Sequence, residues 1–221
     1  MLIKEISNSF GASQYKNNPS LKLPPKEAFP FPVNNPIIEE LYNGIYRGKK
    51  NIHQVNMSEG KAIIAQPNDT IFTGGLMGCY ATFLNVKLKN AKNLAIMTHF
   101  PSGKYSIERK LCELERLVKQ NEYLIDFTQK PTVCTAMPVE YPAFTKELSL
   151  GAADQIEAKL STLFPKGIDN KKIPYKYDLN CLDTHYFIVN YPKNNDDLIR
   201  YSVIREVSTE QIHGDLGKFI L

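Results

Sequence analysis

Residues 79–100 read CYATFLNVKLKNAKNLAIMTHF, and this stretch predicts two neighbouring strands. The part 79–86 alternates in polarity as a strand does, and 94–100 has the apolar character of a buried strand. Only a short polar connection separates them, so we expect the two strands to pair in antiparallel. The start of the first strand, Cys79, should then lie beside the end of the second strand, His99.

The rest of the chain predicts further strands and three helices in an irregular order. The predicted helices cover 36–44, 106–121 and 151–163, and the further strands cover 61–65, 123–129, 131–137, 184–191 and 197–207. The last two strands read as a hairpin. This order departs from regular βαβ alternation and predicts an α+β fold, with a mixed, largely antiparallel sheet or β-sandwich core flanked by helices.

Cap residues and composition predict several boundaries. Pro36 suits the first turn of the first helix, and Gly44 is expected to end that helix. Ser106 is the expected N-cap of the second helix. Residues 1–36 are polar and rich in Asn, Lys and Pro, so we expect them to form an extended N-terminal arm.

Composition and charge argue against several classes of protein. The 221 residues are 43% hydrophobic, which suits one globular domain, and the net charge of +4 is scattered without a basic stripe. We therefore expect no nucleic-acid partner. No apolar run predicts a membrane span, and the first residues lack the apolar region of a cleavable signal peptide. We expect a protein of the bacterial cytoplasm, or one exported into a host cell without a cleaved signal peptide.

Cysteine and histidine spacing predicts no metal site. The four cysteines are Cys79, Cys112, Cys134 and Cys181, and no two are close enough for a CxxC motif. The histidines other than His99 show no ligand spacing with any cysteine or carboxylate; they are His53, His185 and His213. We therefore expect no metal and no organic cofactor. Three of the cysteines suit ordinary core positions, and Cys79 alone has unusual neighbours.

Cys79 ends the glycine-rich segment TGGLMGC, which favours a nucleophile loop. A thiol attacks a carbonyl only as the thiolate, and a nearby imidazole, here His99, can take its proton. The three glycines are Gly74, Gly75 and Gly78. Glycines permit a tight turn that brings peptide N–H groups close to a substrate, so the N–H groups of Gly78 and Cys79 are candidates for an oxyanion hole. The alternative interpretation is a small cysteine packed in a glycine turn.

This segment resembles the nucleophile segment of the chemoreceptor glutamine deamidase family, CheD. Thr73 and Cys79 stand at the family's spacing, with Gly75 and Leu76 between them at the family's positions. The segment THFP around His99 is similar to that of the family's catalytic histidine, and the following GKY leads into a long helix, as in the family. The same Cys-His-Thr layout is shared by the catalytic domain of cytotoxic necrotizing factor and by the Burkholderia lethal factor toxin.

The resemblance covers about residues 61–137 and implies a cysteine-dependent protein-glutamine deamidase. It implies that Cys79 is the nucleophile, that His99 is its base, and that Thr73 orients the imidazole and fixes its tautomer. The implied partner is a protein that bears a target glutamine, including proteins of a host cell, and we expect a monomer. Gly78 stands where CheD has serine, and the long flanks favour a toxin- or effector-like relative over a chemotaxis enzyme.

The resemblance and the polar arm together predict that 37–221 is a single catalytic domain. Its deamidase-like core is followed by a C-terminal elaboration over 138–221. Several of its tyrosines could supply contact surface at a substrate cleft, but we favour ordinary core and surface positions for each of them: Tyr141, Tyr175, Tyr177 and Tyr186.

Two other functions stay open at this stage. A transglutaminase would use the same cysteine and histidine with an amine in place of water as the acyl acceptor. A non-catalytic binding module would keep the fold and bind a receptor or host protein through the 1–36 arm. The variant Cys79→Ser separates catalysis from binding, since it removes only the nucleophile.

Overall fold

The computed structural model of the chain describes residues 35–101, 104–139, 144–176, 184–194 and 198–206. Within these ranges the chain forms three helices and nine strands. In chain order they are α1 (Pro36–Tyr46), β1 (Ile52–Gln54), β2 (Gly60–Ala65), β3 (Thr70–Thr73), β4 (Tyr80–Lys87), β5 (Asn93–Phe100), α2 (Lys104–Gln120), β6 (Thr132–Val139), α3 (Phe144–Leu163), β7 (Asp169–Lys176), β8 (Thr184–Asn190) and β9 (Arg200–Glu206).

The strands form two sheets. One has four strands in the order β1-β3-β8-β9, and the other has five in the order β2-β5-β4-β6-β7. The pairs β1–β3 and β6–β7 are parallel, and the other pairs are antiparallel. The predicted α+β class with mixed, mostly antiparallel sheets is therefore confirmed.

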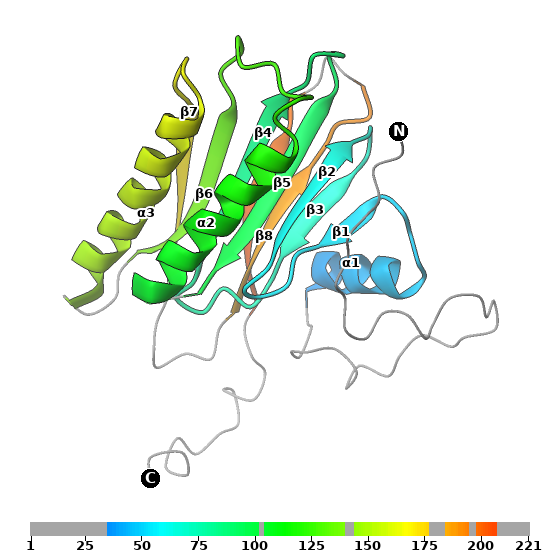
Figure 1. Cartoon of the computed structure of the whole chain (residues 1–221). Helices are drawn as coiled ribbons and strands as arrows, with labels where there is room; N and C mark the ends of the chain where they lie inside the picture. Colours follow the sequence, from blue (N-terminus) through cyan, green and yellow to red (C-terminus); the bar gives the residue numbers. More distant parts are fainter. Residues whose placement is uncertain (1–34, 102–103, 140–143, 177–183, 195–197, 207–221) are drawn as a thin grey trace.

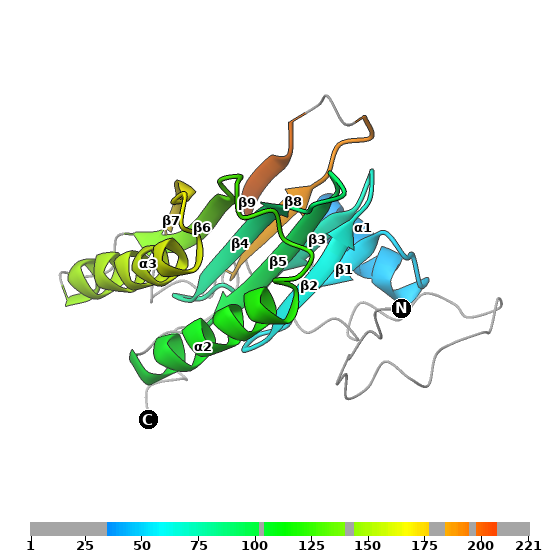
Figure 2. The ribbon, with the colours of Figure 1, turned by 45° about the horizontal axis from the view of Figure 1, so that its top comes forward.

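The two sheets pack face to face and carry helices on their outer faces. Figure 1 shows α2 and α3 side by side over the five-stranded sheet, with β8 behind that sheet, and Figure 2 shows α1 on the far side, beside β1 and β3. Strand β4 explains the layering, because successive side chains point to opposite faces of a sheet. Leu84 and Val86 join the core beneath α2 and α3, whereas Ala81 and Phe83 join the core between the sheets.

The predicted hairpin over 79–100 is confirmed, with β4 and β5 paired in antiparallel and Ala81 opposite His99. Strands β2 and β6 also match their predictions, and β8 pairs with β9 as the predicted final hairpin. Strands β4, β5 and β8 have mostly buried residues, so their apolar patterns are clear in the sequence. The pairs β4–β5 and β8–β9 also join strands that follow one another in the chain.

The predicted strand over 123–129 is wrong. This segment forms turns with a single bridge between Leu88 and Ile125. The carboxylate of Asp126 accepts hydrogen bonds from the backbone N–H of Thr128 at 3.0 Å and from its hydroxyl at 2.6 Å. Such local side-chain bonds favour a turn over an extended ladder. Ile125 is nevertheless fully buried beneath the helices, which explains the apolar character of the segment.

The helix boundaries depart from the cap predictions. α1 continues past Gly44 to Tyr46, and a Cβ added at Gly44 would lie 2.3 Å from the Cδ1 atom of Ile52. A side chain there would have to displace the end of the Ile52 side chain, so Gly44 favours the close approach of β1 and does not end the helix. Ser106 lies inside α2, which begins at Lys104, so the predicted N-cap is also wrong. α3 begins at Phe144, earlier than the predicted 151.

Most of the predicted arm, 1–34, lies outside the described residues. Its last two residues belong to the first helix: the Asn35 side chain caps α1 by accepting a hydrogen bond from the N–H of Ile37 at 3.0 Å, and Pro36 is the first helical residue. The division into an arm and one catalytic domain over 37–221 stays a prediction.

Candidate functional site

Thr73 and His99 meet between the two sheets. Thr73 is the last residue of β3 in the four-stranded sheet, and His99 lies near the end of β5 in the five-stranded sheet. Both side chains are fully buried, and Thr73 Oγ1 lies 2.8 Å from His99 Nδ1. The backbone N–H of His99 donates to the carbonyl of Glu59 at 3.0 Å, which holds this end of β5. Thr73 therefore orients the imidazole, and the Glu59 carbonyl fixes the backbone that carries it.

The second ring nitrogen of His99, Nε2, is buried and has no hydrogen-bond partner among the described residues. A buried polar atom left in this way costs about 1–3 kcal/mol. When Nδ1 carries the proton and donates it to Thr73 Oγ1, Nε2 presents a lone pair. In that tautomer the imidazole can accept a proton at Nε2 while the threonine holds the ring.

Burial keeps His99 uncharged at neutral pH. The pKa of His99 is lowered from 6.5 to about 4, first because the ring is buried and second because the positive charge of Lys110 repels a further charge. Lys110 is itself buried on α2, where its ammonium donates to the Glu113 carboxylate at 2.6 Å and to the carbonyl of Ser58. A neutral imidazole is the form that can act as a general base.

Cys79 lies one residue before β4, and its side chain belongs to the core between the sheets. Ala81 lies in the same core and pairs directly with His99. Since residues two apart on a strand share a face, Cys79 is a diagonal cross-strand neighbour of His99. Strand pairing thus places Cys79 at the same end of the sandwich as the hydrogen-bonded Thr73 and His99, and no hydrogen bond joins the Cys79 thiol to His99 Nε2.

The glycine loop before Cys79 needs its glycines for two separate reasons. Gly75 and Gly78 have positive φ angles of 74° and 79°, which side chains rarely tolerate. Gly74 lies against the ring of Tyr186, and an added Cβ would lie 2.3 Å from the ring's Cε1 atom. The tight turn expected from the sequence is present, while the oxyanion-hole role of the Gly78 and Cys79 N–H groups stays a prediction.

The other described cysteines differ from Cys79 in their surroundings. Cys134 is buried on β6, and burial raises the pKa of its thiol to about 12. Cys112 is exposed on α2, so the core position expected for it is wrong. Cys181 lies outside the described residues.

Tyr175, for which an ordinary core or surface position was favoured, contacts this site. It lies on β7, a strand that was not predicted, and its hydroxyl donates to the carbonyl of Cys79 at 2.5 Å. Its ring also packs against His185 at a centroid distance of 4.6 Å. The signal in the sequence was the spacing of Ile173 and Tyr175 between lysines, an alternation typical of a strand with one buried face.

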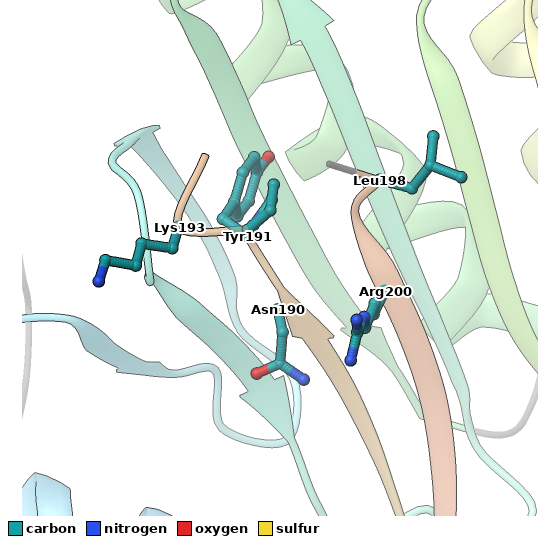
Figure 3. Close-up of a pocket in the computed structure, with 6 residues that line it drawn as sticks. Asn190, Tyr191, Lys193, Leu198 and Arg200 are labelled. Carbon is teal, nitrogen blue, oxygen red and sulfur yellow. The ribbon is translucent and has the colours of Figure 1, made fainter. Parts of the chain in front are cut away.

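A pocket of about 220 Å³ lies away from these residues (Figure 3). Its lining residues are Asn190, Tyr191, Pro192, Lys193, Leu198 and Arg200. Asn190 pairs with Thr70 at the start of β3, whereas Thr73 is at the other end of that strand. The pocket therefore lies at the opposite end of the sandwich, and its lining includes no cysteine, histidine or carboxylate.

The described part of the chain contains no group of three or more His, Cys, Asp or Glu side chains arranged to hold a metal ion. Among the helices that the structure describes, none has both the length and the hydropathy needed to cross a bilayer.

Comparison with known proteins gives a structural similarity, but no protein-family model matches the chain and no curated protein matches its sequence. Among solved structures, the chain is similar to the C-terminal domain of CNFy from Yersinia pseudotuberculosis, with 13% sequence identity and a TM-score of 0.27. The match covers 70% of this chain and 61% of that domain, so the chain spans less than two thirds of its length.

Proposed function

We propose that the protein is a cysteine hydrolase that converts a glutamine side chain of a target protein to glutamate. The observation that carries the proposal is the buried hydrogen bond between Thr73 and His99 Nδ1. The other ring nitrogen, Nε2, has no partner among the described residues. Cys79 packs in the same core between the two sheets. A nucleophile, a base and a group that orients the base are the parts that acyl transfer requires. The resemblance of TGGLMGC to the CheD segment gives independent support.

The reaction proceeds through a thioester. His99 Nε2 accepts the proton of the Cys79 thiol, and the thiolate forms a bond to the carboxamide carbon of the substrate. The carbon–nitrogen bond then breaks, and ammonia leaves with the proton returned by His99. Water, deprotonated by His99, attacks the thioester, so glutamate is released and the thiol is restored. Thr73 holds the imidazole and stabilises it when it is charged.

The burial of the nucleophile favours a side chain as the substrate. Cys79 is only 5% exposed, so a main-chain amide within a folded protein reaches it poorly. A glutamine carboxamide stands on two methylene groups, so it is a slimmer group than a main-chain amide flanked by two residues. This supports a deamidase more than a peptidase.

The test uses the small glutamine substrate benzyloxycarbonyl-Gln-Gly and follows ammonia release. We expect Cys79→Ser to lower kcat by about 10³-fold or more, because it removes the nucleophile. Cys112→Ser, which changes an exposed thiol on α2, is the matched control and should keep full activity.

Three outcomes separate the candidate functions. Ammonia release that depends on Cys79 without an added amine supports the deamidase. Release that needs a primary amine, with that amine incorporated into the product, identifies a transglutaminase instead. Equal activity of Cys79→Ser and the unmodified protein would rule out the proposed catalysis and leave a binding function.

A further inference from the structure

Tyr175 reaches the nucleophile loop from a distant part of the chain. It lies on β7, the outer strand of the five-stranded sheet, and its side chain is buried in the core between the sheets. Its hydroxyl donates a 2.5 Å hydrogen bond to the backbone carbonyl of Cys79. The catalytic steps proposed above use the Cys79 thiol and leave this contact without an assigned role.

His185 holds the other end of the same loop. Its backbone carbonyl, near the start of β8 in the four-stranded sheet, accepts the N–H of Leu76 at 3.0 Å. Its ring packs on the ring of Tyr175, with centroids 4.6 Å apart and planes inclined by 38°. The loop from Leu76 to Cys79 is therefore anchored at both ends by two residues that contact each other across the sandwich.

A hydrogen bond to the carbonyl of Cys79 constrains the backbone directly beside the thiol-bearing residue. That carbonyl belongs to the peptide that joins Cys79 to Tyr80, so a bond to it fixes the plane of that peptide. On the other side, Gly78 sets the entry of the chain with a φ of 79°. With the backbone held on both sides, the direction of the Cα–Cβ bond of Cys79 has little freedom, and only rotation about that bond remains to place the sulfur.

We propose that Tyr175 is a positioning residue, whose hydroxyl aims the Cys79 thiol at His99 through the Cys79 carbonyl. This inference rests on the proposed function. The proposed catalytic residues lie between 73 and 99. Tyr175 adds to them a residue of β7, in the C-terminal part of the chain.

The test is Tyr175→Phe, which keeps the ring against His185 and removes only the hydroxyl. We expect kcat for benzyloxycarbonyl-Gln-Gly to fall about tenfold, with KM within about twofold, because misplacement of a reacting group costs mainly the chemical step. The rate of alkylation of Cys79 by iodoacetamide, located by peptide mass spectrometry and followed as a function of pH, should change as well. A merely structural role would not move that profile.

Tyr191→Phe is the matched control. The Tyr191 hydroxyl donates to the Asn85 side chain at 2.7 Å, in the same core but away from the loop. This variant also loses one hydrogen bond of a tyrosine hydroxyl, here a part-buried one, and we expect it to leave kcat and the alkylation profile of Cys79 unchanged. Thermal unfolding of both variants, with assays done well below the transition, keeps loss of stability separate from loss of positioning.

Each outcome decides one of the two proposals. Unchanged kcat and alkylation in Tyr175→Phe overturn the positioning role while leaving a Cys79-dependent activity intact. Equal losses in Tyr175→Phe and Tyr191→Phe overturn it too, since the effect would then be one of general stability. If Cys79→Ser keeps activity, the proposed function fails, and a changed alkylation profile in Tyr175→Phe would still establish the contact as controlling the thiol.

Discussion

The hydrogen bond between Thr73 and His99 determines which nitrogen of the imidazole can accept a proton. The imidazole is buried and neutral, and the threonine occupies one of its two nitrogens. The other nitrogen, Nε2, is therefore available to accept a proton. Without the hydroxyl, nothing among the contacts described above would select the tautomer that leaves Nε2 as the acceptor.

We predict that Thr73→Val lowers kcat by about tenfold or more, since the third member of a triad orients the base and stabilises its charged form. Valine has nearly the same shape and suits a strand, so the fold should persist. Steady-state ammonia release measures the effect. Thr82→Val removes another buried hydroxyl, which lies 3.3 Å from that of Thr135, and should leave kcat unchanged. An equal loss in both variants would contradict the orienting role.

At the scale of elements, the loop between β3 and β4 is shaped by what packs against it. Gly74 touches the ring of Tyr186, a fully buried side chain that packs edge-on against Tyr42 of α1. The glycine-rich segment therefore serves packing as well as chemistry. A sequence pattern shows the glycines but not which neighbour requires each of them.

We predict that Gly74→Ala destabilises the protein by about 1–3 kcal/mol, because the new methyl group would overlap the Tyr186 ring in a closely packed core. Urea unfolding measures this change. Gly151→Ala is the control, since Gly151 lies in α3 with open space around its Cα. Alanine there should be neutral or add up to about 1 kcal/mol of stability. A Gly74→Ala protein as stable as the parent would refute the contact.

At the scale of the whole molecule, burying a neutral histidine couples the fold to pH. The folded protein has a His99 pKa of about 4, against 6.5 for an ordinary imidazole. As the pH falls, the unfolded chain therefore takes up this proton first, which favours unfolding. The stabilising contribution is fully present above pH 6.5 and is lost between pH 6.5 and about 4.

We predict that this single group lowers the free energy of unfolding by about 3 kcal/mol over that interval, as an upper value. Urea unfolding at several pH values between these limits measures the slope. In His99→Gln the free energy of unfolding should fall less steeply as the pH is lowered, because the carboxylates still titrate but the histidine no longer does. Identical slopes in the two proteins would contradict the lowered pKa.

Local patterns predicted much of the architecture. The pair β4–β5 and the final hairpin β8–β9 join near neighbours in sequence, so alternation and short connections were enough. The apolar periodicity of α2 was equally clear. The strand predictions failed at two places because tertiary context outweighs the local pattern. The apolar segment 123–129 covers the core with turns instead of a strand. Strand β7 lies at the edge of its sheet, and its several lysines make the alternation of buried and exposed residues weak.

Residue patterns were enough to name the glycine loop, the cysteine and the histidine that pairing brings beside it, and a family resemblance added Thr73. The tertiary structure supplied the contact between Thr73 and His99, because β3 and β5 belong to different sheets and are joined by packing rather than by a ladder. It also decided that Tyr175 holds Cys79, since parallel pairing of β6 and β7 requires the crossover through α3. Such contacts depend on which faces of the two sheets meet, and no local periodicity encodes that.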